Sequence, residues 1–531
     1  MAKKKETKKD IKKEEKIEKV EKVVKEDNKE EETKTTFDIY KEKALKYIKK
    51  NKEKVVKYAV SLVILIIVVI VGAVAIKSLN EGSVENLDYP LVYKRENGEI
   101  VLIKSNQKKD DTVTLSSSDG TGYTTYANKT SRYVLIKKGN DLHLYDVKKE
   151  ESTKIADDTS TYYFSDDDSY ILLLDKDNDL YSYNYKEAKK LLEDGIESIQ
   201  DFSNNAVLYA KNETLKFVSM DPSKEDRKEL VNKFEIAEFS EDGKYVLYTN
   251  SNDVLYRYDI KKDKHTKIDS DVKSFYCSNK SCDKLYLTSI KDGYAIYYYN
   301  GSKSEKVIED IDRVLKIDAE NQRLLYTKYI DKQEVLYFKK GNSKEHQVAN
   351  DFLLKGNAKM VGDEIYYTSS KLELKYAKIS GSKTGKTKVI DEEIQKEITE
   401  MKNGVYYMKN PSDDNKEFTV LAALNGKKIK VSDDVKETTI KVSNTGENLY
   451  FQRDFGGSVQ GTLCVFDGEK TTVISESVYH FIHIKDGVTY YLKDFDKEQR
   501  HGSLYRYNGK TEKIEDLVSE LSATPNGYEV K

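Results

Sequence analysis

The chain has 531 residues, more than a single hydrophobic core can organise, so we expect several structural units. Lysine and arginine together number 91, against 93 aspartates and glutamates, so the net charge is close to zero. The sequence contains no basic groove or arginine-rich stripe, which argues against nucleic acid as a partner.

The first 57 residues form a tail with roughly seven excess positive charges. Residues 1–36 are almost entirely Lys, Glu, Thr and Val, and cannot bury enough apolar surface to fold alone. Residues 37–57 place Phe37, Tyr40, Ala44 and Ile48 at helical spacing among lysines. Two interpretations stay open for this stretch: a basic helix lying on anionic lipid, or a solvated extension of the helix that follows.

Residues 58–76 read YAVSLVILIIVVIVGAVAI and carry no charge. A helix of this length covers roughly 28 Å, close to the ~30 Å hydrocarbon core of a bilayer, so we expect a transmembrane helix. A buried core helix and a cleaved signal peptide are the alternatives. The unbroken apolar run and the long charged region before it favour an uncleaved anchor.

Lysines crowd the N-terminal side of this run, whereas Lys77 and Lys94 are the only lysines soon after it. The positive-inside rule therefore predicts a cytoplasmic N-terminus, with residues 77–88 as a stalk and the C-terminal region extracellular. Lysine outnumbers arginine about nine to one, and Tyr, Asn and Ile are abundant, which matches AT-rich codons. We therefore expect a single-pass protein in the plasma membrane of a bacterium with an AT-rich genome.

The region after the stalk repeats. Its clearest unit is FEIAEFSEDGKYVLYTNSNDVLYRYDIKKDKHTKI, residues 234–268, which divides into four short strands separated by Asp-Gly and Asn-Asp turns. Its third strand recurs along the chain at 100–105, 142–147, 180–185, 215–220, 255–260, 296–301, 336–341, 374–379, 421–426, 463–468 and 504–509. This spacing predicts an all-β region of about eleven four-stranded units.

The stretch FSEDGKYVLY resembles the repeat of TolB-type and WD40-like β-propellers, with Phe239, Ser240, Asp242, Gly243 and Tyr245 matching. The resemblance implies a β-propeller. TolB-type families contain binding modules as well as domains attached to enzymes, so it implies no single function.

Propellers usually have four to eight blades. We therefore expect two rings, residues 89–310 and 311–531, with one oversized ring as the alternative. The first unit lacks its own first strand, and residues 526–531 are candidates to supply it by closing a ring between the chain ends.

Residues 447–452 read ENLYFQ, the recognition sequence of the tobacco etch virus protease. The segment keeps the period of the repeat and aligns with second strands at 244–251 and 488–495, whereas an inserted site would break the period. The next residue is Arg453, where that protease prefers a small residue. We interpret the segment as native chain and expect it to be the second strand of its blade.

Two motifs imitate ligand sites. SGSKTGKT at 380–387 approaches a phosphate-binding loop, but Ser380 replaces the first glycine, and the repeat places it in a turn. DKDND at 175–179 imitates the start of a calcium loop, but Leu180 and Lys186 replace its glycine and glutamate. Both segments are expected to be surface turns.

The signals for metal-binding and catalytic motifs are similarly weak. His480 and His483 are three apart on a predicted strand, so they point to opposite faces and cannot share a metal. RDFGG at 453–457 contains the kinase Asp-Phe-Gly tripeptide without the accompanying kinase motifs, and no hydrolase triad or elbow motif is present. We expect no catalytic residue, no metal site and no cofactor.

Cys277 and Cys282 flank a predicted hairpin turn, within reach of each other in an oxidising compartment. We expect a disulfide between them, and a buried strand position for Cys464.

The loops between second and third strands lengthen in the last three units, at 410–417, 453–461 and 493–502. Two of them carry a cation, an acid and an aromatic at matching positions; these are Arg453, Asp454 and Phe455, and Lys493, Asp494 and Phe495. We predict a ligand surface here, since an exposed aromatic beside a cation suits protein or glycan contact. The alternative is that both phenylalanines cap their own blades.

These observations favour a membrane-anchored, extracytoplasmic, non-enzymatic binding or scaffold module. Its expected partners are the lipid bilayer and an envelope protein or wall glycan. A propeller lyase or hydrolase, and a transmembrane sensor whose tail recruits a cytoplasmic partner, are the alternatives.

Overall fold

The computed structural model describes residues 91–523, apart from 104–111, 117–122, 129–131, 204–205 and positions 148, 166, 222, 225, 292, 415 and 486. The charged tail, the apolar run 58–76, the stalk and residues 526–531 lie outside the described residues. No helix in the described part is long and apolar enough to cross a bilayer.

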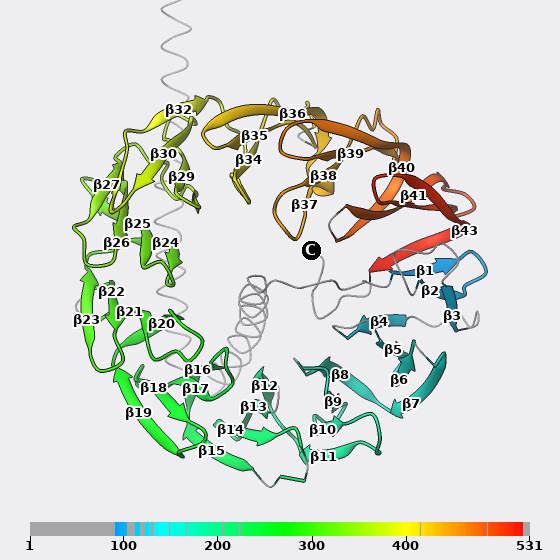
Figure 1. The fold of residues 1–531 in the computed structure, drawn as a ribbon, viewed down its shortest axis with the longest axis horizontal. Helices are drawn as coiled ribbons and strands as arrows, with labels where there is room; N and C mark the ends of the chain where they lie inside the picture. The colour runs from blue at the N-terminus through cyan, green and yellow to red at the C-terminus, as the bar shows by residue number, and fades with distance from the viewer. Residues whose placement is uncertain are drawn as a thin grey trace, which may run out of the picture. The chain divides into compact units, whose positions relative to one another are not determined.

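The described chain is all-β and consists of repeated four-stranded antiparallel sheets, which follow one another around a ring in a propeller-like arrangement (Figure 1). We number eleven such four-stranded units as blades. Seven blades have a sheet of their own: blade 2 is β4 (Tyr123–Ala127), β5 (Tyr133–Lys138), β6 (Asp141–Asp146) and β7 (Glu151–Ala156); blade 3 is β8 (Thr159–Phe164), β9 (Ile171–Asp175), β10 (Leu180–Tyr183) and β11 (Lys190–Glu193); blade 4 is β12 (Ser198–Phe202), β13 (Ala206–Lys211), β14 (Thr214–Ser219) and β15 (Arg227–Asn232); blade 5 is β16 (Phe234–Phe239), β17 (Tyr245–Asn250), β18 (Leu255–Asp259) and β19 (Lys264–Asp269); blade 6 is β20 (Val272–Cys277), β21 (Leu285–Ser289), β22 (Ala295–Tyr299) and β23 (Ser304–Ile308); blade 7 is β24 (Arg313–Asp318), β25 (Arg323–Ile330), β26 (Gln333–Lys340) and β27 (His346–Ala349); and blade 8 is β28 (Ala358–Val361), β29 (Glu364–Thr368), β30 (Leu374–Ser380), β31 (Lys383–Thr384) and β32 (Lys388–Asp391).

The other four blades share one continuous sheet, because three long strands each end one blade and begin the next. They are blade 9, with β33 (Thr399–Met401), β34 (Gly404–Lys409), β35 (Glu417–Leu424) and β36 (Lys427–Lys436); blade 10, with the end of β36, η1 (Glu437–Thr439), β37 (Lys441–Val442), β38 (Leu449–Arg453), β39 (Gly461–Phe466) and the start of β40 (Thr471–Lys485); blade 11, with the end of β40, β41 (Val488–Asp496), β42 (His501–Tyr507) and the start of β43 (Thr511–Ala523); and blade 1, with the end of β43, β1 (Leu91–Arg95), β2 (Ile100–Ile103) and β3 (Thr112–Ser116).

The second strands carry short unbroken apolar runs because both of their faces are covered by neighbouring blades. Val246, Leu247 and Tyr248 on β17 illustrate this, since all three are buried although successive side chains point to opposite faces. Each predicted third-strand segment falls on the third strand of its blade.

The turn in FSEDGKYVLY explains why its residues recur. Ser240 Oγ donates to Asp242 Oδ1 (2.7 Å) and accepts from the Tyr245 backbone N–H (3.0 Å). Gly243 has φ +64°, a conformation that glycine adopts without strain. Ser165 makes the same two contacts with Asp167 and the Tyr170 N–H, so the Ser-x-Asp pattern is a repeated strand-turn device.

The links from each fourth strand to the next first strand share a backbone feature. Every described link contains a residue with left-handed φ; these are Asp158, Gly195, Lys233, Asp271, Asp310, Lys355, Glu393, Asp434, Ser477 and Leu517. A left-handed residue turns the chain sharply. It therefore redirects each outer strand toward the inner edge of the next blade.

The eleven blades form one ring, which corrects the expected division into two rings near residue 310. Gly82–Lys531 is a single compact unit. Hydrophobic clusters lie between successive blades all the way round. One cluster packs Tyr286 and Ile308 of blade 6 against Leu324 and Tyr326 of blade 7, across the expected boundary.

The ring closes through β43. Val518–Ala523 pairs antiparallel with β1, so Leu91 lies opposite Ala523 and Lys94 opposite Glu520. The expectation that the C-terminal chain supplies the first strand of the first blade was therefore correct in kind, but the strand is 518–523 and not 526–531. Val518 and Leu521 are buried against Tyr93, which gives the closing strand its register.

The ENLYFQ segment forms the second strand of blade 10. Leu449, Tyr450, Phe451 and Gln452 are all buried, and Gln452 Nε2 donates to the Val478 backbone oxygen at 2.7 Å. The central position of this strand between β37 and β39 leaves no free peptide edge.

We therefore expect the folded protein to resist cleavage by the viral protease, because a protease must bind its substrate as an extended peptide. Incubation under native conditions should leave the chain intact for hours, whereas the urea-unfolded chain diluted into the same protease should be cut after Gln452. Rapid native cleavage at this position would contradict the strand assignment.

Candidate functional site

The face of each blade on which a residue lies follows from the strand order. Second-to-third-strand turns and fourth-to-first-strand links lie at one end of the strands, which we call the 2–3 face. First-to-second and third-to-fourth turns lie at the other end, which we call the 1–2 face. Backbone hydrogen bonds connect neighbouring segments of the 2–3 face, for example from Ile290 N to Asp271 O (3.2 Å) and from Leu353 N to Thr368 O (3.0 Å).

Phe455, in the loop at 453–461, is packed inward, which corrects the prediction of an exposed aromatic at this position. Phe455 is buried, and Lys436 lies over its ring, 4.6 Å from the centroid. A side chain at Gly461 would approach the Phe455 ring to 2.9 Å, so the glycine makes room for it. Arg453 pairs with the neighbouring Asp454, which has left-handed φ.

The matching segment in blade 11 is mostly strand, since β41 continues to Asp496 and β42 begins at His501. Phe495 stacks on Tyr479 at 3.9 Å and lies over Gly502. Asp494, like Asp454, has left-handed φ. Lys493 precedes Asp494 just as Arg453 precedes Asp454.

Gln460 connects the two loops. Its Oε1 accepts from the Phe495 N–H (2.9 Å), and its Nε2 donates to the Phe495 backbone oxygen (3.1 Å). The six predicted residues therefore lie near one another on the 2–3 face, but both phenylalanines serve blade packing.

A different part of the 2–3 face exposes large apolar side chains. Five of them occur on three successive blades, 6, 7 and 8, which are neighbours in Figure 1; they are Ile290 (50% exposed), Tyr329 (56%), Ile330 (40%), Leu354 (58%) and Leu372 (41%). We call these five residues the loop-tip surface. The other exposed large hydrophobic residues are scattered over outer strands, a first strand and later links; they are Leu191, Tyr276, Val389, Val473, Tyr479 and Leu517.

A long hairpin carries the centre of this surface. β25 and β26 stay paired to the last residue, Ile330 with Gln333, around a two-residue turn of Asp331 (φ 49°) and Lys332 (φ 66°). Two successive left-handed residues make the tight hairpin turn whose twist matches the strands. The pairing of β25 with blade 7's first strand stops at Thr327, so Tyr329 and Ile330 extend past the neighbouring strand.

An ion pair between the half-buried Arg313 and the buried Glu334 fixes the Leu354 segment beside the hairpin. Arg313 binds Glu334 through Nε–Oε1 (2.6 Å) and Nη2–Oε2 (3.1 Å), and the Glu334 side chain is 1% exposed. Arg313 Nη2 also donates to the Gly356 oxygen (3.0 Å), and the Lys355 N–H donates to Glu334 Oε2 (2.5 Å). The network therefore holds the 353–356 turn against blade 7.

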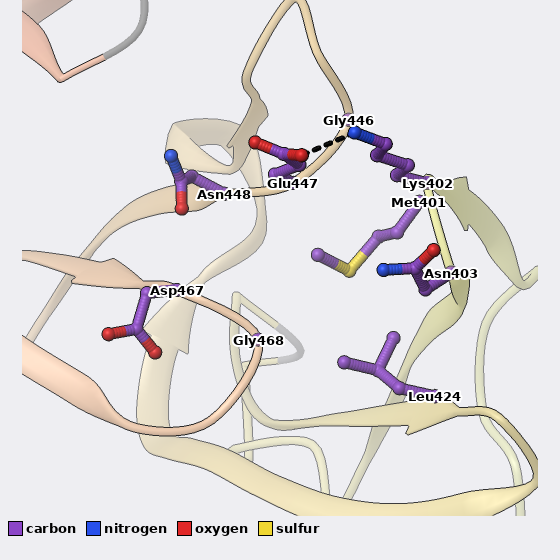
Figure 2. A pocket seen from close by; sticks show the side chains of 9 residues that line it. All are labelled: Met401, Lys402, Asn403, Leu424, Gly446, Glu447, Asn448, Asp467 and Gly468. Atoms are coloured by element: carbon purple, nitrogen blue, oxygen red, sulfur yellow. Dashed lines mark hydrogen bonds and ion pairs between the residues drawn. The ribbon is translucent and has the colours of Figure 1, made fainter.

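On the 1–2 face, a cavity of about 220 Å³ lies between blades 9 and 10 (Figure 2). Lys402 and Glu447 form an ion pair at its edge, and Met401 and Leu424 line the side toward blade 9. Its volume is below the ~300–1,000 Å³ of sites for drug-sized ligands. Its lining residues come from four short turns. Their charged side chains do not converge on a common point where a ligand could bind.

Two carboxyl groups lie close together on neighbouring first strands, Asp201 on β12 and Glu238 on β16. Burial, and then the negative charge of Asp201, raises the pKa of Glu238 to about 8. Asp201 Oδ2 accepts the Phe239 N–H at 2.7 Å, so this carboxylate ties the two blades together.

The weaker motifs have structural roles. DKDND is the turn between β9 and β10, where Asp175 Oδ1 accepts the N–H groups of Asp177 and Asp179. The segment 380–387 lies at the turn from β30 to β31. Among the residues that the structure describes, no group of three or more His, Cys, Asp or Glu side chains is arranged to hold a metal ion.

His480 is exposed and His483 is buried, on opposite faces of β40. Burial lowers the pKa of His483 to about 4, and its ring stacks on Tyr450 at 4.0 Å. Cys277 and Cys282 form a disulfide, and Cys464 is a buried free thiol.

No family model and no curated protein sequence matches this chain. The structure is similar to a solved eukaryotic initiation factor, with 11% identity and a TM-score of 0.38, covering 83% of this chain and 99% of that one. It is also similar to the tricorn protease, with 11% identity and a TM-score of 0.27, covering 81% of this chain and 58% of that one.

Proposed function

We propose that the protein is a non-enzymatic binding or scaffold module of the cell envelope, anchored by residues 58–76 and displaying its ring outside the cell. The loop-tip surface is its binding surface. The neighbouring exposure of five large apolar side chains on one face is the observation that supports this proposal.

Single exposed apolar residues are ordinary, but a contiguous group on one face marks an interaction site. Each square ångström of apolar surface left in water costs about 25 cal/mol relative to burial, so a partner that covers this group gains free energy. The tight hairpin turn holds Tyr329 and Ile330, and the Arg313–Glu334 network holds the Leu354 segment, so these tips need to gain little order on binding.

Thiol accessibility on cells tests this proposal. Single cysteines at Leu354 and, as a control of similar exposure on an outer strand, Leu191 are labelled with a membrane-impermeant maleimide. The native cysteines do not compete, because Cys464 is buried and the other two are disulfide-bonded.

We expect L354C to react at least five-fold more slowly on intact cells than in purified protein, whereas L191C reacts equally in both. Equal reactivity of L354C in both states would contradict the binding surface. Failure of both positions to react on cells would contradict the extracellular location.

A further inference from the structure

The outer part of the 1–2 face carries a group of lysines on blade 8. Acids and cations are almost equal in number over the whole chain, but residues 374–390 contain five lysines and no acid. Four of these lysines are exposed and lie around the turn from the third to the fourth strand of the blade, in and beside the segment SGSKTGKT; they are Lys378, Lys383, Lys386 and Lys388. We call these four residues the lysine surface.

Strand pairing directs three of these lysines toward blade 9. Lys388 lies opposite Tyr376, and Tyr376 packs in the cluster that joins blades 8 and 9. Lys378 is two residues after Tyr376 on β30, so its side chain leaves the same face of the sheet. Lys383 pairs with Ser380, which is two residues further along, and therefore continues the row.

Blade 9 adds positive charge across from this row. On β36, Lys428 lies opposite Ala423 and Lys430 lies opposite Leu421, and both apolar partners belong to the cluster shared with blade 8. The Lys428 ammonium reaches Asp391 on β32 at 2.8 Å, so the outer strands of the two blades are neighbours, as Figure 1 shows. Cations from two blades therefore line one stretch of the outer rim.

Four acids lie on the strands and turns next to the lysine surface, and each accepts from another cation or from a hydroxyl; they are Asp363, Glu364, Asp391 and Asp433. Glu364 lies opposite Lys378, but its oxygens accept from the Tyr366 hydroxyl (2.5 Å) and the Tyr376 hydroxyl (3.0 Å). The exposed Glu392 and Glu393 follow the other end of β32, on the 2–3 face. Among the residues that the structure describes, no carboxylate lies within ion-pair distance of the lysine surface.

The lysine surface lacks the groups that anchor a protein partner. Among residues 374–390, the large apolar side chain that is exposed is Val389, which lies opposite Lys375 on the face that packs on blade 7. Protein interfaces are depleted in lysine and rely on aromatic and arginine anchors. Binding here depends on charge, which suits a linear polyanion that releases its counterions to the lysines.

The side chains favour a polymer with phosphodiester groups and no bases. Lysine binds phosphate as a point charge, and serine hydroxyls, such as those of Ser380 and Ser382 between the lysines, also contact phosphate oxygens. Nucleic acids are held in addition by aromatic side chains that stack on bases and by arginines that read base edges. Blades 8 and 9 contain no arginine, and the exposed large aromatic side chains of the described chain lie on blades 6, 7 and 11.

We propose that the lysine surface binds a phosphodiester-linked polymer of the polyol phosphate class. The four lysines each neutralise a phosphate, and Lys428 and Lys430 extend the track onto blade 9. This inference goes beyond the function proposed above and does not depend on the loop-tip surface, which lies on the opposite face of the ring.

Lysine footprinting of the full-length chain in detergent tests this proposal. An amine-reactive reagent is added with and without poly(glycerol phosphate), and mass spectrometry reads the modification at each lysine. We expect roughly three-fold protection or more at the lysine surface, and no comparable protection at four exposed lysines of the 2–3 face, Lys291, Lys332, Lys355 and Lys371. Polymer bound to the basic N-terminal tail is read on separate peptides. Equal protection of both sets, or of neither, would overturn the proposal.

A variant with all four residues of the lysine surface changed to glutamine measures their contribution. We expect its affinity, read as the polymer concentration that half-protects Lys428 and Lys430, to fall at least ten-fold, and the slope of log affinity against log salt to become shallower by roughly three. The matched control changes the four 2–3-face lysines to glutamine, which removes the same charge, and should keep both values. Equal losses in the two variants would contradict a local site.

Two further polymers with the same number of charges test the chemistry of the ligand. Polyglutamate should protect the lysine surface more weakly than poly(glycerol phosphate); equal or stronger protection would overturn the proposal in favour of an acidic protein segment. Oligothymidylate should bind no more tightly than poly(glycerol phosphate), because a surface without aromatic side chains gains nothing from bases. Tighter binding would overturn the proposal in favour of single-stranded nucleic acid. None of these results depends on the labelling of L354C on cells, so the proposed function and this inference can fail separately.

Discussion

Replacement of Glu334 by alanine is expected to lower the free energy of unfolding by about 2–3 kcal/mol, because it leaves the half-buried Arg313 guanidinium and the Lys355 N–H without their acceptor. The loss also frees the Lys355 N–H that Glu334 accepts, so the 353–356 turn loses one of its supports. Chemical denaturation, followed by tyrosine fluorescence and circular dichroism, measures the effect.

Two controls make this result specific. Glu447→Ala removes a solvent-exposed pair with Lys402 and should cost less than about 1 kcal/mol. The double variant Arg313→Leu/Glu334→Leu should be more stable than Glu334→Ala, because it removes both charges of the pair together. Equal, small losses for Glu334→Ala and Glu447→Ala would show that the buried network does not hold blades 7 and 8.

Removal of the closing strand should have the largest effect on the fold. A chain that ends after Leu517 lacks Val518 and Leu521, which pack against Leu91 and Tyr93 of blade 1. Blade 1 then loses its first strand and its contact with blade 11. We expect loss of the cooperative thermal transition, or proteolysis that starts within residues 91–116.

A chain that ends after Ala523 is the matched control, since it keeps the whole of β43 and lacks only residues 524–531. Its melting temperature should lie within a few degrees of that of the full chain. Severe damage in this shorter truncation, with none added by removing 518–523, would return the closing role to residues 526–531.

The blades themselves were predictable because their signals are local. The apolar run of each second strand, the Ser-x-Asp turn and the recurring third strand lie within about 40 residues of one another. This periodicity also placed ENLYFQ in a strand, since Leu449–Arg453 keeps the register of its neighbours.

The number of rings was not predictable in the same way. The sequences of the links between blades resemble one another, and the link between Ile308 and Arg313 has no feature that would mark the end of a ring. Ring size depends on the small angle between adjacent blades, summed over all of them, and no single repeat specifies that angle. The closing strand was misplaced for a related reason, because β43 continues through Leu517 without a turn signal.

The binding surface depends on how far loops project, which loop length alone does not reveal. The long loop at 453–461 folds back, because Gly461 leaves space for Phe455. The two-residue turn after Ile330 is short, yet its strands extend past their neighbours and expose the tip. Apolar residues beside lysine in successive 2–3 turns were the available sequence signal.

A common 2–3 face exists only if all eleven blades belong to one closed ring, so this is the central claim. It is tested by disulfide cross-linking of Lys94→Cys with Glu520→Cys, which lie opposite each other in the β1–β43 pair. We expect near-complete oxidation of this pair in the folded protein and none for Lys94→Cys with Asp310→Cys. Cross-linking of 94 with 310, and not with 520, would contradict the single ring and favour two rings divided near residue 310.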